Sequence, residues 1–224
     1  MNKSVTVRAP INIAVIKYWG KADENLMIPC NDSISMTLDS PELVTETTIT
    51  ADPFLEEDEF YLEGHPEVTI NKRIKKCIET ARDLASKIVN NSKLVTWKLK
   101  IKSKNSVPTA AGLASSASGI AALSFALIKL YDLESTFCLG QLSCIARFGS
   151  GSACRSLFGG LVHWHGENVE EVGNWEGLNG FVLVFNEERK KIPSTVGMQT
   201  TVKTSSLFQH RISSVVPERV TPML

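Results

Sequence analysis

A run of small residues, Pro108 to Gly119, directly precedes an apolar segment from Ile120 to Tyr131. The apolar segment is rich in alanine and leucine, which predicts a buried helix. The first N–H groups of a helix lack intrahelical partners and its N-terminal end is electrically positive, so this end stabilises anions. Ser115, Ser116 and Ser118 could add hydroxyl donors. The run therefore predicts a phosphate-binding loop. The alternative is a loop whose residues are small only for packing. This alternative stays open because the run has neither the Walker lysine pattern nor G-x-G-x-x-G spacing.

Length, charge and cysteine content set broad limits on the class of protein. The 224 residues can bury the core of one large or two small domains. Lysine plus arginine (24) balance aspartate plus glutamate (24), so no overall field favours nucleic acid or an anionic membrane. No apolar run approaches the roughly 20 residues that span a bilayer, and no signal-peptide core follows the first residues. Five cysteines without a C-x-x-C pair predict reduced thiols, and hence a cytoplasmic protein.

The order of expected elements is typical of an α+β fold. The first third is mostly strand, and its expected strands cover residues 5–8, 11–16, 33–38 and 42–50, with a hairpin of 60–62 and 68–70. Apolar residues at spacings of three and four predict a helix over 71–90, and alternation predicts a strand over 95–101. The remaining expected elements are a helix at 138–148, a strand at 161–164, a polar loop at 166–180, a strand at 181–185 and a helix at 205–216 that stops at Pro217.

Two further motifs combine small residues with cations. Residues 9–21 read Ala-Pro-Ile-Asn-Ile-Ala-Val-Ile-Lys-Tyr-Trp-Gly-Lys, and residues 150–156 read Ser-Gly-Ser-Ala-Cys-Arg-Ser, a second small-residue anion loop. Isolated lysines are usually solvated, but the Tyr-Trp-Gly between Lys17 and Lys21 favours ligand contact. For Arg155, a structural ion pair with a carboxylate is the alternative to a ligand.

Two other candidate groups are interpreted as packing residues. His163 and His165 alternate on the strand expected near 161–164, so they share a face and could hold a metal. No third ligand is apparent in the sequence, so a packed or surface pair is preferred and no metal ligand is predicted. Cys154 could be a reactive thiol beside Arg155, but no basic partner lies near it in sequence, and packing is preferred.

Together, the three motifs resemble those of the diphosphomevalonate decarboxylase family, within the GHMP kinase superfamily. The resemblance runs over essentially the whole chain, including residues 194–198 and 215–217. It implies a GHMP-kinase-type N-terminal lobe, of the ribosomal protein S5 domain 2-like kind, over residues 1–180. It also implies that residues 181–224 form a fragment of an incomplete ferredoxin-like C-terminal lobe.

The resemblance implies ATP-dependent decarboxylation of (R)-5-diphosphomevalonate to isopentenyl diphosphate, with release of ADP, phosphate and CO2, in the mevalonate route to isoprenoids and sterols. ATP, Mg2+ and a homodimer are expected with it. The implied catalytic residues are Asn12, Lys17 and Arg155, where Arg155 holds the substrate carboxylate, Asn12 positions Arg155 and Lys17 lies near the reacting hydroxyl. The implied substrate-binding residues are Tyr18, Trp19, Gly20, Lys21, Arg73, Ser150, Gly151, Ser152, Ala153, Cys154, Arg155, Ser194 and Thr195. The implied nucleotide-binding residues are Gly112, Ala114, Ser115 and Ser116.

The sequence also departs from the family pattern. The family's catalytic aspartate comes from an Asp-Ala-Gly-Pro-Asn segment, which these 224 residues do not contain. This departure favours an alternative, a truncated chain of little activity that binds nucleotide or substrate or partners a full-length subunit. A small-molecule kinase is a further alternative, which Lys-Tyr-Trp-Gly-Lys weakens. Asp32 stands where the family usually has serine, which puts a carboxylate near an anion site and predicts weaker binding.

Overall fold

Two four-stranded sheets and a set of helices form the α+β fold that the sequence predicts. The structure is a computed structural model that describes residues 2–39, 42–67, 69–88, 93–106, 115–175, 177–178 and 192–224. The strand orders are β1-β6-β8-β7 and β10-β9-β5-β2, and β3 (Lys21–Asp23) pairs with β4 (Ile28–Pro29). The expected strand at 181–185 and the expected lobe boundary at residue 180 lie outside the described residues, so both stay predictions.

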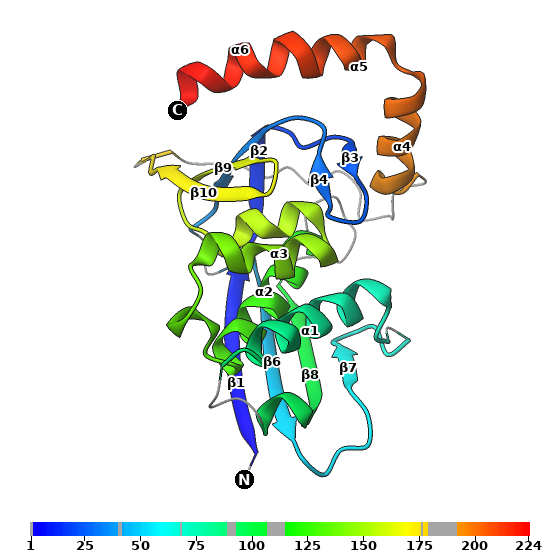
Figure 1. Cartoon of the computed structure of the whole chain (residues 1–224), viewed down its shortest axis with the longest axis vertical. Helices are drawn as coiled ribbons and strands as arrows, with labels where there is room; N and C mark the ends of the chain where they lie inside the picture. The colour runs from blue at the N-terminus through cyan, green and yellow to red at the C-terminus, as the bar shows by residue number, and fades with distance from the viewer. Residues whose placement is uncertain are drawn as a thin grey trace.

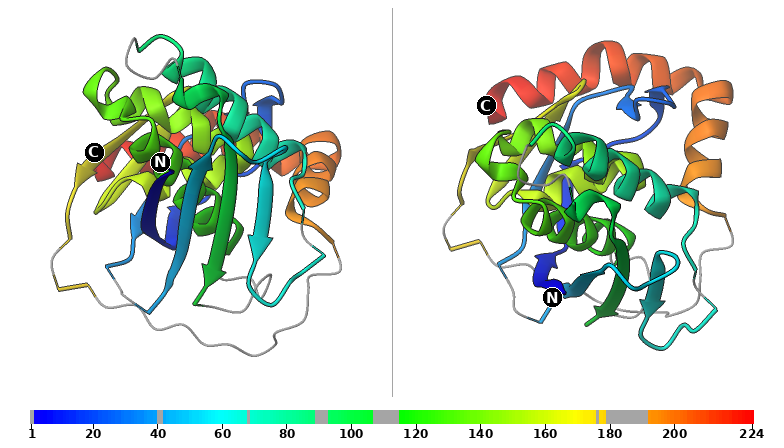
Figure 2. Two further views of the ribbon diagram at one scale, coloured as in Figure 1. Left: turned by 90° about the horizontal axis from the view of Figure 1, so that it is seen from below. Right: turned by 60° about the horizontal axis from the view of Figure 1, so that its bottom comes forward.

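The first sheet carries the main core on one face. Its strands are β1 (Lys3–Pro10), β6 (Val44–Asp52), β8 (Lys98–Asn105) and β7 (Glu59–Leu62). Every second residue of β6 is buried, because alternate side chains point to the same face of a strand. The helices α1 (Lys72–Ala85), α2 (Ser115–Leu130) and α3 (Leu139–Gly149) lie behind this sheet in Figure 2, left. Ile49, Leu99, Leu127 and Ile145 meet in the resulting core.

The second sheet separates two smaller cores. It contains β2 (Asn12–Ile16), β5 (Ser33–Thr37), β9 (Leu161–His165) and β10 (Asn168–Gly173), all antiparallel. Trp164 points to one face, where it packs with Tyr18 and Cys154. Ile34 points to the other face, where it packs with Val216 of the C-terminal helices. The side chains of consecutive residues along β5 and along β9 therefore point to opposite faces of the sheet.

The chain ends in a series of helical segments. They are α4 (Ser194–Thr204), α5 (Ser206–His210), the π-helical turn η5 (Arg211–Val215), α6 (Val216–Val220) and the 3-10 turn η6 (Thr221–Met223). Figure 1 shows α4 beside β3 and β4, and α5 and α6 across the end of the molecule. The expectation that the helix stops at Pro217 is wrong. Pro217 lies in α6, which directly follows the π-helical turn η5, and the helical backbone continues through it.

Several other expected elements need correction. The polar loop expected at 166–180 contains β10, a strand whose residues are mostly exposed and include the charged Glu170 and Glu171. The hairpin expected from 60–62 and 68–70 does not form, since β7 pairs in parallel with β8 and the described residues 69–71 are not strand. The strand expected at 95–101 starts at Lys98, after the 3-10 helix η2 (Leu94–Thr96). The small-residue loop after α3 is the 3-10 helix η4 (Gly151–Leu157).

None of the described helices combines the length and the apolar character that crossing a membrane requires.

Candidate functional site

The helix η4 places Arg155 inside the protein, against the second sheet. It follows α3 after Ser150, whose carbonyl oxygen accepts a hydrogen bond of 2.8 Å from the Ala153 N–H. Gly151 allows the close approach, because a Cβ there would lie 3.0 Å from Cε1 of Tyr18 and 3.2 Å from Cη2 of Trp164. The glycine and the following small residues therefore serve packing, which brings the arginine against the aromatic pair.

Arg155 is a buried cation with neutral hydrogen-bond partners. Its Nε donates to Oγ of Ser35 at 3.0 Å, and its Nη2 donates to Oδ1 of Asn12 at 3.1 Å. The guanidinium lies 5.7 Å from the ring centroid of Trp164. Only 3% of the residue is exposed, and burial lowers the pKa of the guanidinium. Within the described residues, Nη1 has no hydrogen-bond partner and no carboxylate pairs with this arginine.

Asn12 connects Arg155 to the backbone of η4. Its Nδ2 donates to Oγ of Ser156 at 2.7 Å and to the carbonyl oxygen of Ser152 at 3.1 Å. The same amide accepts from Arg155 through its oxygen, so its orientation is defined at both ends. The expected Asn12–Arg155 pair is thus brought into contact, while its role in a reaction stays a prediction.

Tyr18 forms the wall beside the guanidinium. Its ring lies 4.8 Å from that of Trp164 at an interplanar angle of 51°, a tilted geometry typical of aromatic pairs. The hydroxyl is buried and, in the part of the chain described, has no hydrogen-bond partner. Burial raises the pKa of Tyr18, so the hydroxyl keeps its proton and can donate to an anion. Arg155 and Tyr18 therefore offer two unused donors in one site.

The turn after Tyr18 is held by the C-terminal helices. Gly20 has a φ of +81°, and a Cβ there would lie 2.8 Å from Cζ of Phe208 and 2.8 Å from Cγ2 of Val202. Trp19 lies under α4, since a Cβ on Gly197 would come within 3.6 Å of its Cζ2. α4 and α5 thus determine where the turn with its flanking lysines lies.

Other expected binding residues lie around this turn. Arg73, in the first turn of α1, donates from Nη2 to Oγ1 of Thr195 at 3.3 Å, next to the exposed Ser194. Lys17 is exposed, and its carbonyl oxygen accepts from Arg211 Nη2 at 2.9 Å. Segments more than a hundred positions apart in the sequence therefore meet here.

The expected phosphate loop is described only at its end. Gly112 and Ala114 lie outside the described residues, as does the side chain of Ser115, the first residue of α2. Ser116 is exposed in the first turn of α2. The idea that Ser118 adds a donor is wrong, because this residue is buried and its Oγ is 2.8 Å from Oγ1 of Thr45.

Sequence reasoning missed the residues that hold Arg155 from the second sheet. Ser35 and Trp164 stand in ordinary strand patterns, and only the pairing of β5 with β9 brings them to η4. Cys154 is buried, its Sγ donates to the Gly151 carbonyl oxygen at 2.9 Å, and burial raises the pKa of the thiol to about 12. Such a thiol is neutral and unreactive at ordinary pH.

A surface hollow of about 480 Å³ lies near this site without containing it. Its lining includes Pro10, Thr37, Asp39, Ser156 and Gly160. None of the residues expected to bind substrate or nucleotide belongs to that lining, whose charged residues are Arg8, Asp39 and Glu171. The candidate site is therefore formed by the donors of Arg155 and Tyr18 that have no partner among the described residues.

Comparison with known families agrees with the motifs. A model described as the diphosphomevalonate decarboxylase-like N-terminal domain matches residues 9–172, and a model of the mevalonate 5-diphosphate decarboxylase C-terminal domain matches residues 180–224. The chain belongs to the diphosphomevalonate decarboxylase family.

Relatives and solved structures lead to the same family. The diphosphomevalonate decarboxylase of Schizosaccharomyces pombe is 48% identical over 100% of this chain and 61% of the relative. A crystal structure of mevalonate 5-diphosphate decarboxylase is 42% identical, with a TM-score of 0.84 over 97% of this chain and 59% of that one. Another, a complex with MVAPP, AMPPCP and magnesium, is 39% identical, with a TM-score of 0.77 over 99% of this chain and 67% of that one. The chain spans about three fifths of the length of the first two relatives.

Proposed function

We propose that this protein carries out the ATP-dependent decarboxylation of (R)-5-diphosphomevalonate to isopentenyl diphosphate, with release of ADP, phosphate and CO2, in the mevalonate pathway. One observation carries the proposal. Among the described residues, Arg155 is a buried cation whose hydrogen-bond partners are neutral and whose Nη1 has no partner. Burying an unneutralised charge is unfavourable, so a substrate anion is the natural partner. Family membership supports the choice of substrate.

The substrate has a carboxylate at one end and a diphosphate at the other, with a tertiary hydroxyl near the carboxylate. The planar guanidinium of Arg155 would hold the carboxylate through charge-assisted hydrogen bonds, and the Tyr18 hydroxyl would donate a further one. Ser35 and Asn12 fix the plane of the guanidinium, so the carboxylate would be held in one orientation. That orientation matters because the C–C bond electrons form the new double bond as CO2 and phosphate leave.

The other expected residues would act at the hydroxyl and the diphosphate. Lys17 would stabilise negative charge that develops on the reacting hydroxyl oxygen. Arg73, with Ser194 and Thr195 beside it, would contact the diphosphate. The first turn of α2, where Ser116 is exposed, suits the phosphates of ATP. Bound Mg2+ would neutralise phosphate charge during transfer. We also propose a cytoplasmic homodimer, as the family resemblance implies.

A coupled assay of ADP and CO2 release tests this function. The proposal concerns the whole protein, whereas these 224 residues contain no Asp-Ala-Gly-Pro-Asn segment, so we expect these residues alone to bind the substrate with little or no turnover. The assay uses the folded chain with ATP, Mg2+ and 5-diphosphomevalonate, next to a calorimetric titration. Equimolar ADP and CO2 would show that another group replaces the aspartate. ADP without CO2 would favour the kinase alternative, and a folded chain that binds neither ligand would overturn the proposal.

A further inference from the structure

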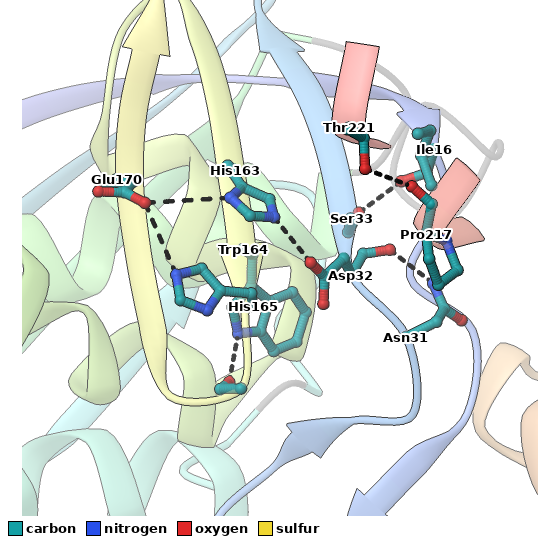
Figure 3. Close-up of polar contacts among 11 residues, drawn as sticks. Ile16, Asn31, Asp32, Ser33, His163, Trp164, His165, Glu170, Pro217 and Thr221 are labelled. Carbon is teal, nitrogen blue, oxygen red and sulfur yellow. Dashed lines mark hydrogen bonds and ion pairs between the residues drawn. The ribbon is translucent and has the colours of Figure 1, made fainter. Parts of the chain in front are cut away.

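The hairpin of β9 and β10 places two histidines and a glutamate together. His163 and His165 lie two positions apart on β9, so their side chains leave the same face, and their rings stack with centroids 4.7 Å apart. Glu170 of β10 is directly opposite His163 in the strand register. Its Oε1 lies 3.9 Å from Nδ1 of His163 and 3.6 Å from Nε2 of His165 (Figure 3). The strand pairing supplies the third group that the sequence alone does not reveal.

A fourth residue fixes the orientation of His163. Oδ2 of Asp32 lies 2.9 Å from Nε2 of His163, on the side of the ring away from Glu170. In the tautomer that carries its proton on Nε2, His163 donates to Asp32, and the lone pair of Nδ1 points toward Glu170. A carboxylate on the remote nitrogen is the arrangement that orients histidine ligands of metal ions and increases their basicity. Asp32 is thus committed to His163, on the opposite face from Arg155.

Three possible metal-ligand atoms lie close together on this face of the hairpin. The three ligand atoms, from His163, His165 and Glu170, all lie within 4.8 Å of one another. Tetrahedral bonds of about 2.0–2.2 Å to a metal place ligand atoms about 3.4 Å apart, so a small contraction would form the site. His165 and Glu170 can provide it, because their side chains are 40% and 58% exposed while that of His163 is only 6% exposed.

We propose that His163, His165 and Glu170 form a binding site for one divalent transition-metal ion, with Asp32 as the positioning residue of His163. Two imidazole nitrogens and a carboxylate oxygen are a donor set that suits Zn2+, and three protein ligands leave a fourth position for water. The site is separate from the Mg2+ that would accompany ATP. Trp164, between the two histidines, points to the opposite face of the sheet, where it contacts the guanidinium of Arg155. The metal would therefore bind behind the candidate active site and join both strands of the hairpin to the start of β5.

A zinc titration of the metal-stripped 224-residue chain tests this proposal. We expect one Zn2+ per chain and a higher midpoint of thermal unfolding when zinc is bound, because a ligand of the folded state stabilises it. His165→Ala and Glu170→Gln should each lower the zinc affinity by more than about 100-fold, and Asp32→Asn by about 10–100-fold. The matched control is His210→Ala, since His210 is exposed on α5 and should leave zinc affinity unchanged.

Cobalt gives a second readout that does not depend on mutation. Co2+ bound by imidazole and carboxylate should give the visible bands of a four- or five-coordinate ion without thiolate charge-transfer absorption. Thiolate absorption would assign the metal to cysteines such as the exposed Cys138 and would overturn the proposal. The proposal also fails if zinc binds the His163→Ala, His165→Ala and Glu170→Gln triple variant as tightly as the unmodified chain. Failure of stoichiometric binding to the folded, unmodified chain would also overturn the proposal. None of these results bears on the decarboxylase proposal.

Discussion

Arg155 shows how one residue can be stabilised in place without having its charge neutralised. Asn12 and Ser35 satisfy two of its nitrogens with neutral oxygens, and Trp164 covers its flat face. A carboxylate in place of Ser35 would neutralise the guanidinium and would compete with the substrate carboxylate. Among the described residues Nη1 has no hydrogen-bond partner, which lowers the stability of the fold and leaves a donor for an anion.

Buried thiols make the stability of the fold sensitive to alkaline pH. Burial raises the pKa of Cys77 from 9.0 to about 12, so the folded state keeps a proton that the unfolded state releases near pH 9. The unfolded state then binds fewer protons, and the free energy of unfolding falls as pH rises from 9 toward 12. We expect Cys77→Ala to reduce this decline by up to about 1.4 kcal/mol per pH unit, measured by urea unfolding. The matched control is Cys138→Ala, whose thiol is exposed; equal slopes for the two variants would contradict the prediction.

At the scale of elements, the docking of α4 and α5 determines the position of the Tyr-Trp-Gly turn. Gly20→Ala forces a Cβ to within 2.8 Å of Phe208 and Val202 and also strains a φ of +81°. We expect a loss of about 1–3 kcal/mol in the free energy of unfolding and weaker binding of 5-diphosphomevalonate. Gly64→Ala is the matched control, since its φ is +75° and a Cβ there meets nothing within 4 Å. Equal losses of stability in both variants would show that backbone strain, not helix docking, dominates.

Elements with a continuous apolar stripe could be predicted from the sequence, and elements without one could not. α1 was predicted because Ile74, Cys77, Ile78 and Ala81 repeat at helical spacing and are buried. β10 was missed because Val169 is its one buried residue and the rest of the strand is stabilised by backbone pairing with β9. α4 was missed because none of its residues is buried, so it has no stripe to detect. Periodicity detects burial, and elements at the surface give little of that signal.

At the scale of the whole molecule, the candidate site depends on contacts between segments that are distant in sequence. The resemblance of the motifs to the decarboxylase family predicted that Asn12, Tyr18 and Arg155 matter. They could not predict that Ser35 and Trp164 complete the site, since this follows from the register of β5 on β9. The same register places Glu170 opposite His163, on the other face of the sheet. The local sequence motifs thus identified candidate site residues, and the pairing of distant strands determines which residues contact them.

The central claim is that Arg155 is the anion receptor of this fold, and a calorimetric titration with 5-diphosphomevalonate tests it most directly. Arg155→Lys keeps the positive charge but removes the planar fork that Ser35 and Asn12 orient. We predict that this variant binds about 10–100-fold more weakly than the unmodified chain, as expected for the loss of charge-assisted hydrogen bonds. Arg219→Lys, at an exposed position on α6, should bind as the unmodified chain does. Equal affinity in all three proteins would contradict the account.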